Sequence, residues 1–247
     1  MKAIEKPQAI VYTTLFLLLA LIALILTLSG CYSECVEGYR DVISQDRASQ
    51  PFSEVISQGS FSVVIIPAQE TRIVVKAESN LLPYIYTMSD GTTMTVRFSN
   101  GVNINEHYPV EVFLYTPVLK SAWLSGSGNI QFSGFNTTDM NLQISGSGNL
   151  NAGFAADNLN ASISGSGNMT LAGNATNGTL AVSGSGNINS QGLIQEHCNA
   201  SISGSGNCIV AVSKALEAFI SGSGTAYYIG SPVITTHITG SGSVQKY

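Results

Sequence analysis

Charged side chains are scarce in this sequence: Lys, Arg, Asp and Glu make up 10% of the 247 residues, against about 25% in an ordinary globular protein. Disordered segments combine low hydrophobicity with high net charge, whereas 44% of these residues are hydrophobic, so the composition favours a packed core. Positive charge is scarcest, since residues 121–247 contain no Arg and only Lys214 and Lys246. Nucleic-acid binding needs clustered Lys and Arg, and we therefore expect no nucleic-acid partner.

Cysteine is also scarce, with four residues at Cys31, Cys35, Cys198 and Cys208. Neither a second closely spaced Cys pair nor a His pair accompanies Cys31 and Cys35, as a zinc site would require. The repeated Asp of calcium-binding repeats is missing as well. We predict no metal and no cofactor, while a disulfide between Cys198 and Cys208 stays open.

The N-terminus carries an export signal. Lys2 and Lys6 precede an apolar run over residues 11–28, which at 1.5 Å per residue covers about 27 Å and suffices for a tilted transmembrane helix. The run ends in Leu28-Ser29-Gly30-Cys31, which resembles a prokaryotic lipobox with Cys31 as the lipidated residue. Both alternatives make residues 1–31 a signal peptide or membrane anchor and place the rest in the cell envelope, outside the cytoplasmic membrane, as periplasm or cell surface.

A repeat dominates the second half of the chain. The motif [Ser/Thr]-Gly-Ser-Gly recurs seven times at intervals of 18 to 20 residues, beginning at Ser125, Ser145, Ser164, Ser183, Ser203, Ser221 and Thr239. A flexible Gly-Ser linker has no reason to keep apolar residues in register with its glycines. Here the residue before each motif from the second copy on is β-branched: Ile144, Ile163, Val182, Ile202, Ile220 and Ile238.

Apolar residues alternate with polar ones around each motif, which is typical of strands. This parity directs both glycines of the motif inward and the two Ser and the following Asn outward. A recurring helix is excluded because two Gly in each unit would break it. We therefore predict an all-β parallel β-helix, or solenoid, with coils of 18–20 residues over residues 121–247. Seven coils stacked about 4.8 Å apart make a rod about 30 Å long.

Residues 51–120 contain strand-like runs without the motif, separated by turn signals such as Asp90-Gly91. We expect this N-terminal β region to form either a cap or irregular first coils, because an open solenoid end exposes unpaired strand edges. Residues 32–50 are more polar and are predicted to be a linker. No cap follows the last motif, which predicts an end-to-end homo-oligomer.

The part from about Phe52 to Val244 resembles the auto-transporter adhesin head family known as the GIN domain, a domain of unknown function. The resemblance rests on Ser125-Gly126-Ser127-Gly128-Asn129-Ile130 and its successors, preceded by Val110-Glu111-Val112 and Pro117-Val118-Leu119. It implies an exported β-solenoid, often a lipoprotein, and it brings no catalytic or binding residue.

Parallel β-helices include enzymes that act on polysaccharides, and such sites need paired acids. The acids of the repeats, Asp139, Asp157, Glu196 and Glu217, fall near one corner and are interpreted as solvated. His107 and His237 have no evident partner in the sequence. We therefore predict no enzymatic activity and no catalytic residue.

The outward Ser and Asn rows form the candidate contact ladder. Its central members are Ser145, Ser147, Asn149, Ser164, Ser166, Asn168, Ser183, Ser185, Asn187, Ser203, Ser205 and Asn207. Two interpretations stay open: hydrogen bonding that satisfies a tight turn, and a repetitive surface for a glycan or protein ligand. The leading hypothesis is an adhesion or interaction module, and the alternatives are a spacing protein of the envelope and a polysaccharide-acting enzyme.

Overall fold

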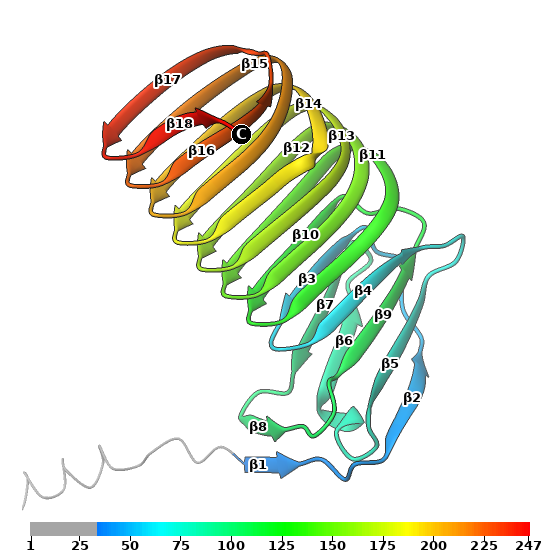
Figure 1. Ribbon diagram of the computed structural model, residues 1–247. Helices are drawn as coiled ribbons and strands as arrows, with labels where there is room; N and C mark the ends of the chain where they lie inside the picture. Colours follow the sequence, from blue (N-terminus) through cyan, green and yellow to red (C-terminus); the bar gives the residue numbers. More distant parts are fainter. Residues whose placement is uncertain (1–33) are drawn as a thin grey trace, which may run out of the picture.

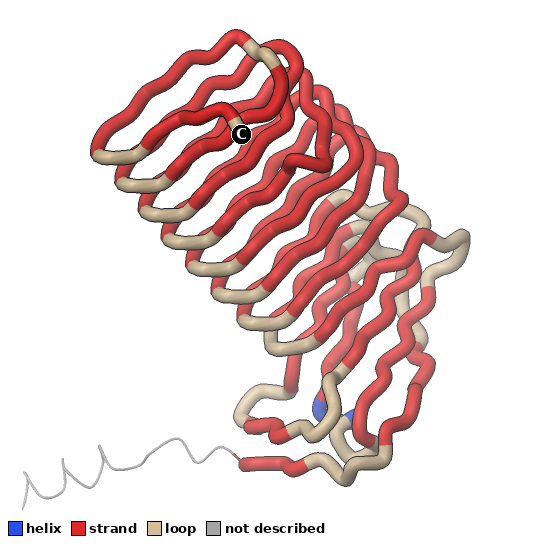
Figure 2. The backbone as a smooth tube through the Cα atoms, in the orientation of Figure 1, coloured by secondary structure: helices blue, strands red, loops and turns tan. Residues whose placement is uncertain are grey.

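A computed structural model describes residues 34–247 of the protein, and 74% of this part is in strands (Figures 1 and 2). The predicted anchor over residues 1–31, including Cys31, lies outside the described residues. Within residues 34–247, no helix has the length and apolar character needed to cross a bilayer.

Coils of parallel strands form the body of the molecule (Figure 1). The strands from one Ser-Gly-Ser-Gly corner to the next are long and bend once on the way, namely β11 (Asn129–Gly146), β12 (Asn149–Gly165), β13 (Asn168–Gly184), β14 (Asn187–Gly204) and β15 (Asn207–Gly222). Shorter strands flank them, namely β10 (Ser121–Gly126), β16 (Thr225–Gly230), β17 (Val233–Gly240) and β18 (Ser243–Lys246). Each motif pairs in register with the next, as Ser145 does with Ser164 and Gly146 with Gly165. The predicted β-solenoid is confirmed.

The two halves of each coil face each other across a narrow apolar core. Ile144, Ile163 and Val182, each immediately before a motif, are at most 2% exposed. Burying such a side chain contributes roughly 1.5–3 kcal/mol, so the repeated β-branched residue stabilises every coil. In the last coil the equivalent Ile238 is 44% exposed. End-to-end association through that coil stays a prediction.

The two glycines of each motif have different roles. The second one is buried as predicted: a Cβ on Gly167 would lie 2.7 Å from the core atom Cγ2 of Ile144 and 2.5 Å from the carbonyl oxygen of Gly148, both in the preceding coil. The inward orientation predicted for the first one is wrong. Gly165 has a φ of +126°, and its Cβ would lie 2.5 Å from the carbonyl oxygen of Gly146, so it faces the neighbouring coil along the stacking direction. The alternation of inward and outward side chains fails at this position, because a residue with a positive φ interrupts the extended backbone.

Residues 51–120 form both a first coil and a cap, which are the two alternatives predicted from the sequence. β3 (Glu54–Gln58) and β4 (Ser62–Pro67) form a coil that pairs in parallel with β10 and β11. The chain then leaves the solenoid for β5 (Arg72–Glu78), the 3₁₀ helix η1 (Leu82–Tyr84), β6 (Ile85–Ser89), β7 (Thr93–Phe98), β8 (Val102–Asn105) and β9 (Glu111–Thr116). β7 and β9 pair in parallel with β3 and β4 and make a further layer.

Antiparallel strands cover that layer. β6 pairs with β7, and β5 with β9. The predicted linker over residues 32–50 carries two strands, β1 (Glu34–Glu37) and β2 (Val42–Arg47). β2 pairs antiparallel with β5, and β1 pairs with β8, so these residues are part of the cap, because backbone pairing with cap strands compensates for their polar composition.

Candidate functional site

The predicted contact ladder lies on the Ser-Gly-Ser-Gly corner of the solenoid, and we call it the corner face. It comprises Ser145, Ser147, Asn149, Ser164, Ser166, Asn168, Ser183, Ser185, Asn187, Ser203, Ser205 and Asn207, all exposed or half-buried. Backbone bonds between coils fix it: the amides of Ser166 and Gly167 both donate to the carbonyl of Gly146, each at 3.0 Å. The structure therefore aligns all twelve residues in three parallel rows.

The asparagine row is a hydrogen-bonded ladder. Asn168 Nδ2 donates to Asn149 Oδ1 at 3.3 Å, and Asn187 Nδ2 donates to Asn168 Oδ1 at 3.0 Å. Asn207 continues the ladder onto Asn187 at 3.1 Å. Within the described part of the chain, the hydroxyls of the eight Ser of the corner face take part in no intramolecular hydrogen bond. The asparagines thus stabilise the corner, while the serine hydroxyls remain available to an external partner.

The acidic residues of the repeats do not gather with one another. Glu196 pairs with Lys214 Nζ at 2.6 Å, which lowers the pKa of that carboxyl. Glu217 lies 3.6 Å from His237 Nε2. Asp139 accepts a hydrogen bond from Asn158 Nδ2 at 3.0 Å. Each of these three carboxylates has a partner of another kind.

Sequence reasoning missed a second amide ladder. Asn177 Nδ2 donates to Asn158 Oδ1 at 3.1 Å, and Asn158 in turn donates to Asp139. Six positions before Ser145, Ser164 and Ser183 stand Asp139, Asn158 and Asn177, respectively. Comparison of the repeats at this position would have identified the ladder.

Both histidines that lacked a partner in the sequence have one in the structure. His237 stacks on Phe219, with ring centroids 4.7 Å apart and an interplanar angle of 10°. His107 lies between two acids, with Nε2 3.4 Å from Glu37 Oε1 and Nδ1 3.4 Å from Glu78 Oε1. The contact of His237 follows from the repeat, because Phe219 and His237 both stand two residues before a motif and pair in adjacent coils. The contacts of His107 join segments distant in sequence, and no local pattern signals them.

The two cysteines of the solenoid are buried and free. Burial raises the pKa of Cys198 to about 12 and places that of Cys208 well above its ordinary value. The thiolate is the reactive form of cysteine. Cys198 and Cys208 therefore act as small apolar core residues rather than as nucleophiles or metal ligands.

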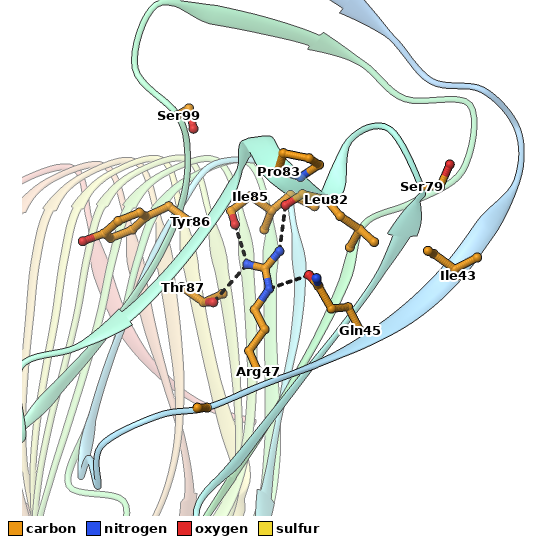
Figure 3. Close-up of a pocket in the computed structure, with 11 residues that line it drawn as sticks. Ile43, Gln45, Arg47, Ser79, Leu82, Pro83, Ile85, Tyr86, Thr87 and Ser99 are labelled. Atoms are coloured by element: carbon orange, nitrogen blue, oxygen red, sulfur yellow. Dashed lines mark hydrogen bonds between the residues drawn. The ribbon is translucent and has the colours of Figure 1, made fainter.

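A groove at the cap end is the second candidate site (Figure 3). It has a volume of about 720 Å³ and lies between β2 on one side and η1 with β6 on the other. Pro83 is the second residue of the short helix η1. The turn Asp90-Gly91 orients β6, because Asp90 Oδ1 accepts hydrogen bonds from the amides of Thr92 and Thr93 at 2.9 and 2.8 Å. We call this the cap groove.

Arg47 crosses the cap groove. Its partner on β5 is the buried Ile73, so the Arg47 side chain extends from the inner face of β2 toward β6. Nη1 donates to the carbonyl of Ile85 and to Thr87 Oγ1, and Nη2 donates to the carbonyl of Leu82 at 2.7 Å. The guanidinium thereby connects the two edge strands of the cap. Sequence reasoning did not single out Arg47, because one Arg in a polar stretch carries no local signal.

The fold and the corner face define a capped parallel β-solenoid with a regular, uncharged row of hydroxyls. Residues 51–232 match the model of the family described as "Putative auto-transporter adhesin, head GIN domain", and the chain belongs to this family. The resemblance seen in the sequence is confirmed. No curated protein matches the chain.

Solved structures from three bacteria share the fold. A "putative adhesin" from Bacteroides fragilis has 19% identity and a TM-score of 0.82, with 86% of this chain and 100% of that one covered. A "Putative lipid binding protein" from Parabacteroides distasonis has 23% identity and a TM-score of 0.75, with 87% and 100% covered. A "putative adhesin" from Parabacteroides merdae has 23% identity and a TM-score of 0.71, with 87% and 99% covered.

Proposed function

We propose that the protein is a non-enzymatic adhesion or interaction module of the cell envelope, and that the corner face is its contact surface. Residues 1–31 anchor it to the membrane, either as a retained helix or through lipidated Cys31, and the solenoid is displayed outside the cytoplasmic membrane. The observation that carries this proposal is the row of serine hydroxyls that the fold aligns but does not use internally.

The chemistry of the corner face suits a neutral, repetitive ligand such as a glycan. Residues 121–213 contain no Lys or Arg, and the three acids among them lie outside the corner face. Hydroxyls spaced about 4.8 Å apart along each row match a partner that repeats along its own length. Family membership supports the adhesion class, since the family is described as an adhesin head.

The test replaces three serines of one row by lysine: Ser164→Lys, Ser183→Lys and Ser203→Lys. Three long cations on adjacent coils should block a flat neutral ligand and reduce attachment of cells displaying the protein, and glycan-array binding, at least tenfold. The side chains are exposed, so the circular dichroism spectrum should stay that of the wild type.

A matched control makes the same charge change about half a coil away from the corner face, with Asn136→Lys, Ala155→Lys and Asn174→Lys, which pair in register and are exposed or half-buried. This variant should bind as the wild type does. Undiminished binding of the corner-face variant with an intact fold would show that another surface makes the contact. Loss of envelope integrity with no change in binding would favour the spacing protein, and turnover of a saccharide would favour the enzyme.

A further inference from the structure

The cap groove contains a charged group, the guanidinium of Arg47, that has no charged partner. Arginine has five N–H donors and keeps its charge at physiological pH. Four of the five N–H donors of Arg47 make hydrogen bonds: Nε–H donates to Gln45 Oε1 at 2.9 Å, and two hydrogens of Nη1 and one of Nη2 are also donated. All four acceptors are neutral. Of the described residues that line the groove, Arg47 is the only charged one, so its charge is hydrogen-bonded but not neutralised.

The unused donor lies on the accessible edge of the guanidinium. Nη2 donates one of its two hydrogens to Leu82, and the other remains free. In Figure 3, Gln45 approaches the edge of the guanidinium opposite Thr87. Gln45 is exposed, so its side chain can turn away at little cost. Displacing its amide oxygen would free Nε–H beside the unused Nη2–H, the paired arrangement that binds a carboxylate through both oxygens.

Apolar side chains line part of the groove, alongside the polar Gln45, Ser79, Thr87 and Ser99. Ile43 on β2 is 48% exposed, and Leu82, Pro83, Ile85 and Tyr86 line the opposite side. An exposed isoleucine beside an unneutralised arginine is complementary to a molecule with an anionic head and an apolar body. The volume of about 720 Å³ falls within the roughly 300–1,000 Å³ that is usual for small-molecule sites.

We propose that the cap groove binds a monocarboxylate with an apolar chain, of the fatty-acid class. The carboxylate replaces Gln45 Oε1 and accepts hydrogen bonds from Nε and Nη2 of Arg47. The chain lies against Ile43 and Pro83. This site is distinct from the corner face and does not depend on the proposed adhesion function.

An extended peptide fits the groove less well. Strand addition needs several unpaired backbone groups along β6. The carbonyl of Ile85 is bound to Arg47, and Ser89 Oγ donates to the carbonyl of Pro51 at 3.0 Å, which holds the loop before β3 against the end of β6. Thr87 alone remains open between them, too short a stretch for a peptide strand.

The experiment measures binding of radiolabelled octanoate to the full-length protein in lipid nanodiscs by equilibrium dialysis, with empty nanodiscs as background. We expect saturable binding of one octanoate per chain. Octanol lacks the head group and acetate lacks the chain, so each should bind at least tenfold more weakly. Arg47→Gln should lower octanoate affinity at least tenfold.

Gln45→Glu is the decisive variant, because Arg47→Gln removes contacts that hold the cap and can disturb folding. A glutamate at position 45 supplies an internal carboxylate to the same donors. It should raise the melting temperature and still lower octanoate affinity at least tenfold. Octanoate binding unchanged by Gln45→Glu, equal binding of octanol, or no saturable binding to the wild type would each overturn the proposal, as would stronger competition by a short apolar peptide than by octanoate.

Discussion

Replacing Gly165 by alanine is expected to lower the free energy of unfolding by about 3 kcal/mol or more. Gly165 has a φ of +126°, and a Cβ would lie 2.5 Å from the carbonyl oxygen of Gly146. Backbone strain in this Gly-only region costs of order 1–3 kcal/mol, and overpacking adds typically 1–3 kcal/mol. The carbonyl cannot retreat, because it accepts hydrogen bonds from the amides of Ser166 and Gly167. Urea unfolding followed by circular dichroism measures the loss.

Gly192→Ala is the matched control. Gly192 has no positive φ, and its nearest neighbour, Ala172 Cβ, would be at an ordinary contact distance of 3.5 Å. Here alanine should stabilise by up to about 0.4–1 kcal/mol, because it reduces the freedom of the unfolded chain. Equal losses for the two variants would contradict the assignment of Gly165 to the coil contact.

Glu78→Ala is expected to detach the N-terminal segment from the cap. The Glu78 side chain is fully buried and accepts hydrogen bonds from the amides of Arg40 and His107 at 2.6 and 2.9 Å. A fully buried donor left without a partner costs about 1–3 kcal/mol, and water can partly replace Glu78 at these half-buried amides. We expect a local loss of about 2 kcal/mol, measured as lost hydrogen-exchange protection of these two amides, while the amides of β12 and β13 keep theirs.

The hydrogen bonds to Glu78 make the stability of this part of the cap depend on pH. Burial raises the pKa of Glu78, but the backbone donors of His107, Arg40 and Tyr108 outweigh it and hold the pKa below the ordinary value of 4.5. A lowered pKa in the folded state means that the stabilisation is complete above pH 4.5 and is lost as the pH falls through the folded-state pKa. Protection at Arg40 and His107 should decline in acid. Glu78→Gln keeps the shape and should abolish this dependence; a persistent decline would assign it to another group.

The repeat made the solenoid predictable. Seven motifs in register with β-branched residues such as Ile163 and Val182 determine which side chains are buried, how long a coil is and that the coils stack. The first glycine of the motif was misplaced because parity assumes extended backbone. A recurrent glycine is compatible with a positive φ, and the structure shows one at the first glycine of the motif.

The cap was beyond sequence reasoning, because its spatial order differs from its chain order. The β3–β4 coil precedes β7 and β9 in sequence but lies between them and β10–β11. Periodicity reports local conformation, not such long-range pairing. Arg47 and Glu78 owe their roles to contacts with residues 29 to 40 positions away, and the cap groove was missed for that reason.

One exception to the alternation of buried apolar and exposed polar residues is visible only in the structure. Gln195 is fully buried, and its Oε1 occupies the space that a Cβ on Gly178 would fill. Equivalent positions to Gly178 in the neighbouring coils are Leu159 and Cys198. Glycine at one position thus makes room for a large polar side chain from the next coil. Alternation alone would place a glutamine outside.

Everything proposed for the corner face requires its serines to stand in straight rows. Double electron–electron resonance tests this directly, with nitroxides at Ser127→Cys and Ser223→Cys in a chain whose Cys31 and exposed Cys35 are replaced by Ser, since Cys198 and Cys208 are buried. These positions are five coil steps apart, which at about 4.8 Å each predicts a narrow distribution near 24 Å. A broad distribution centred well beyond this distance would contradict the stacked corner.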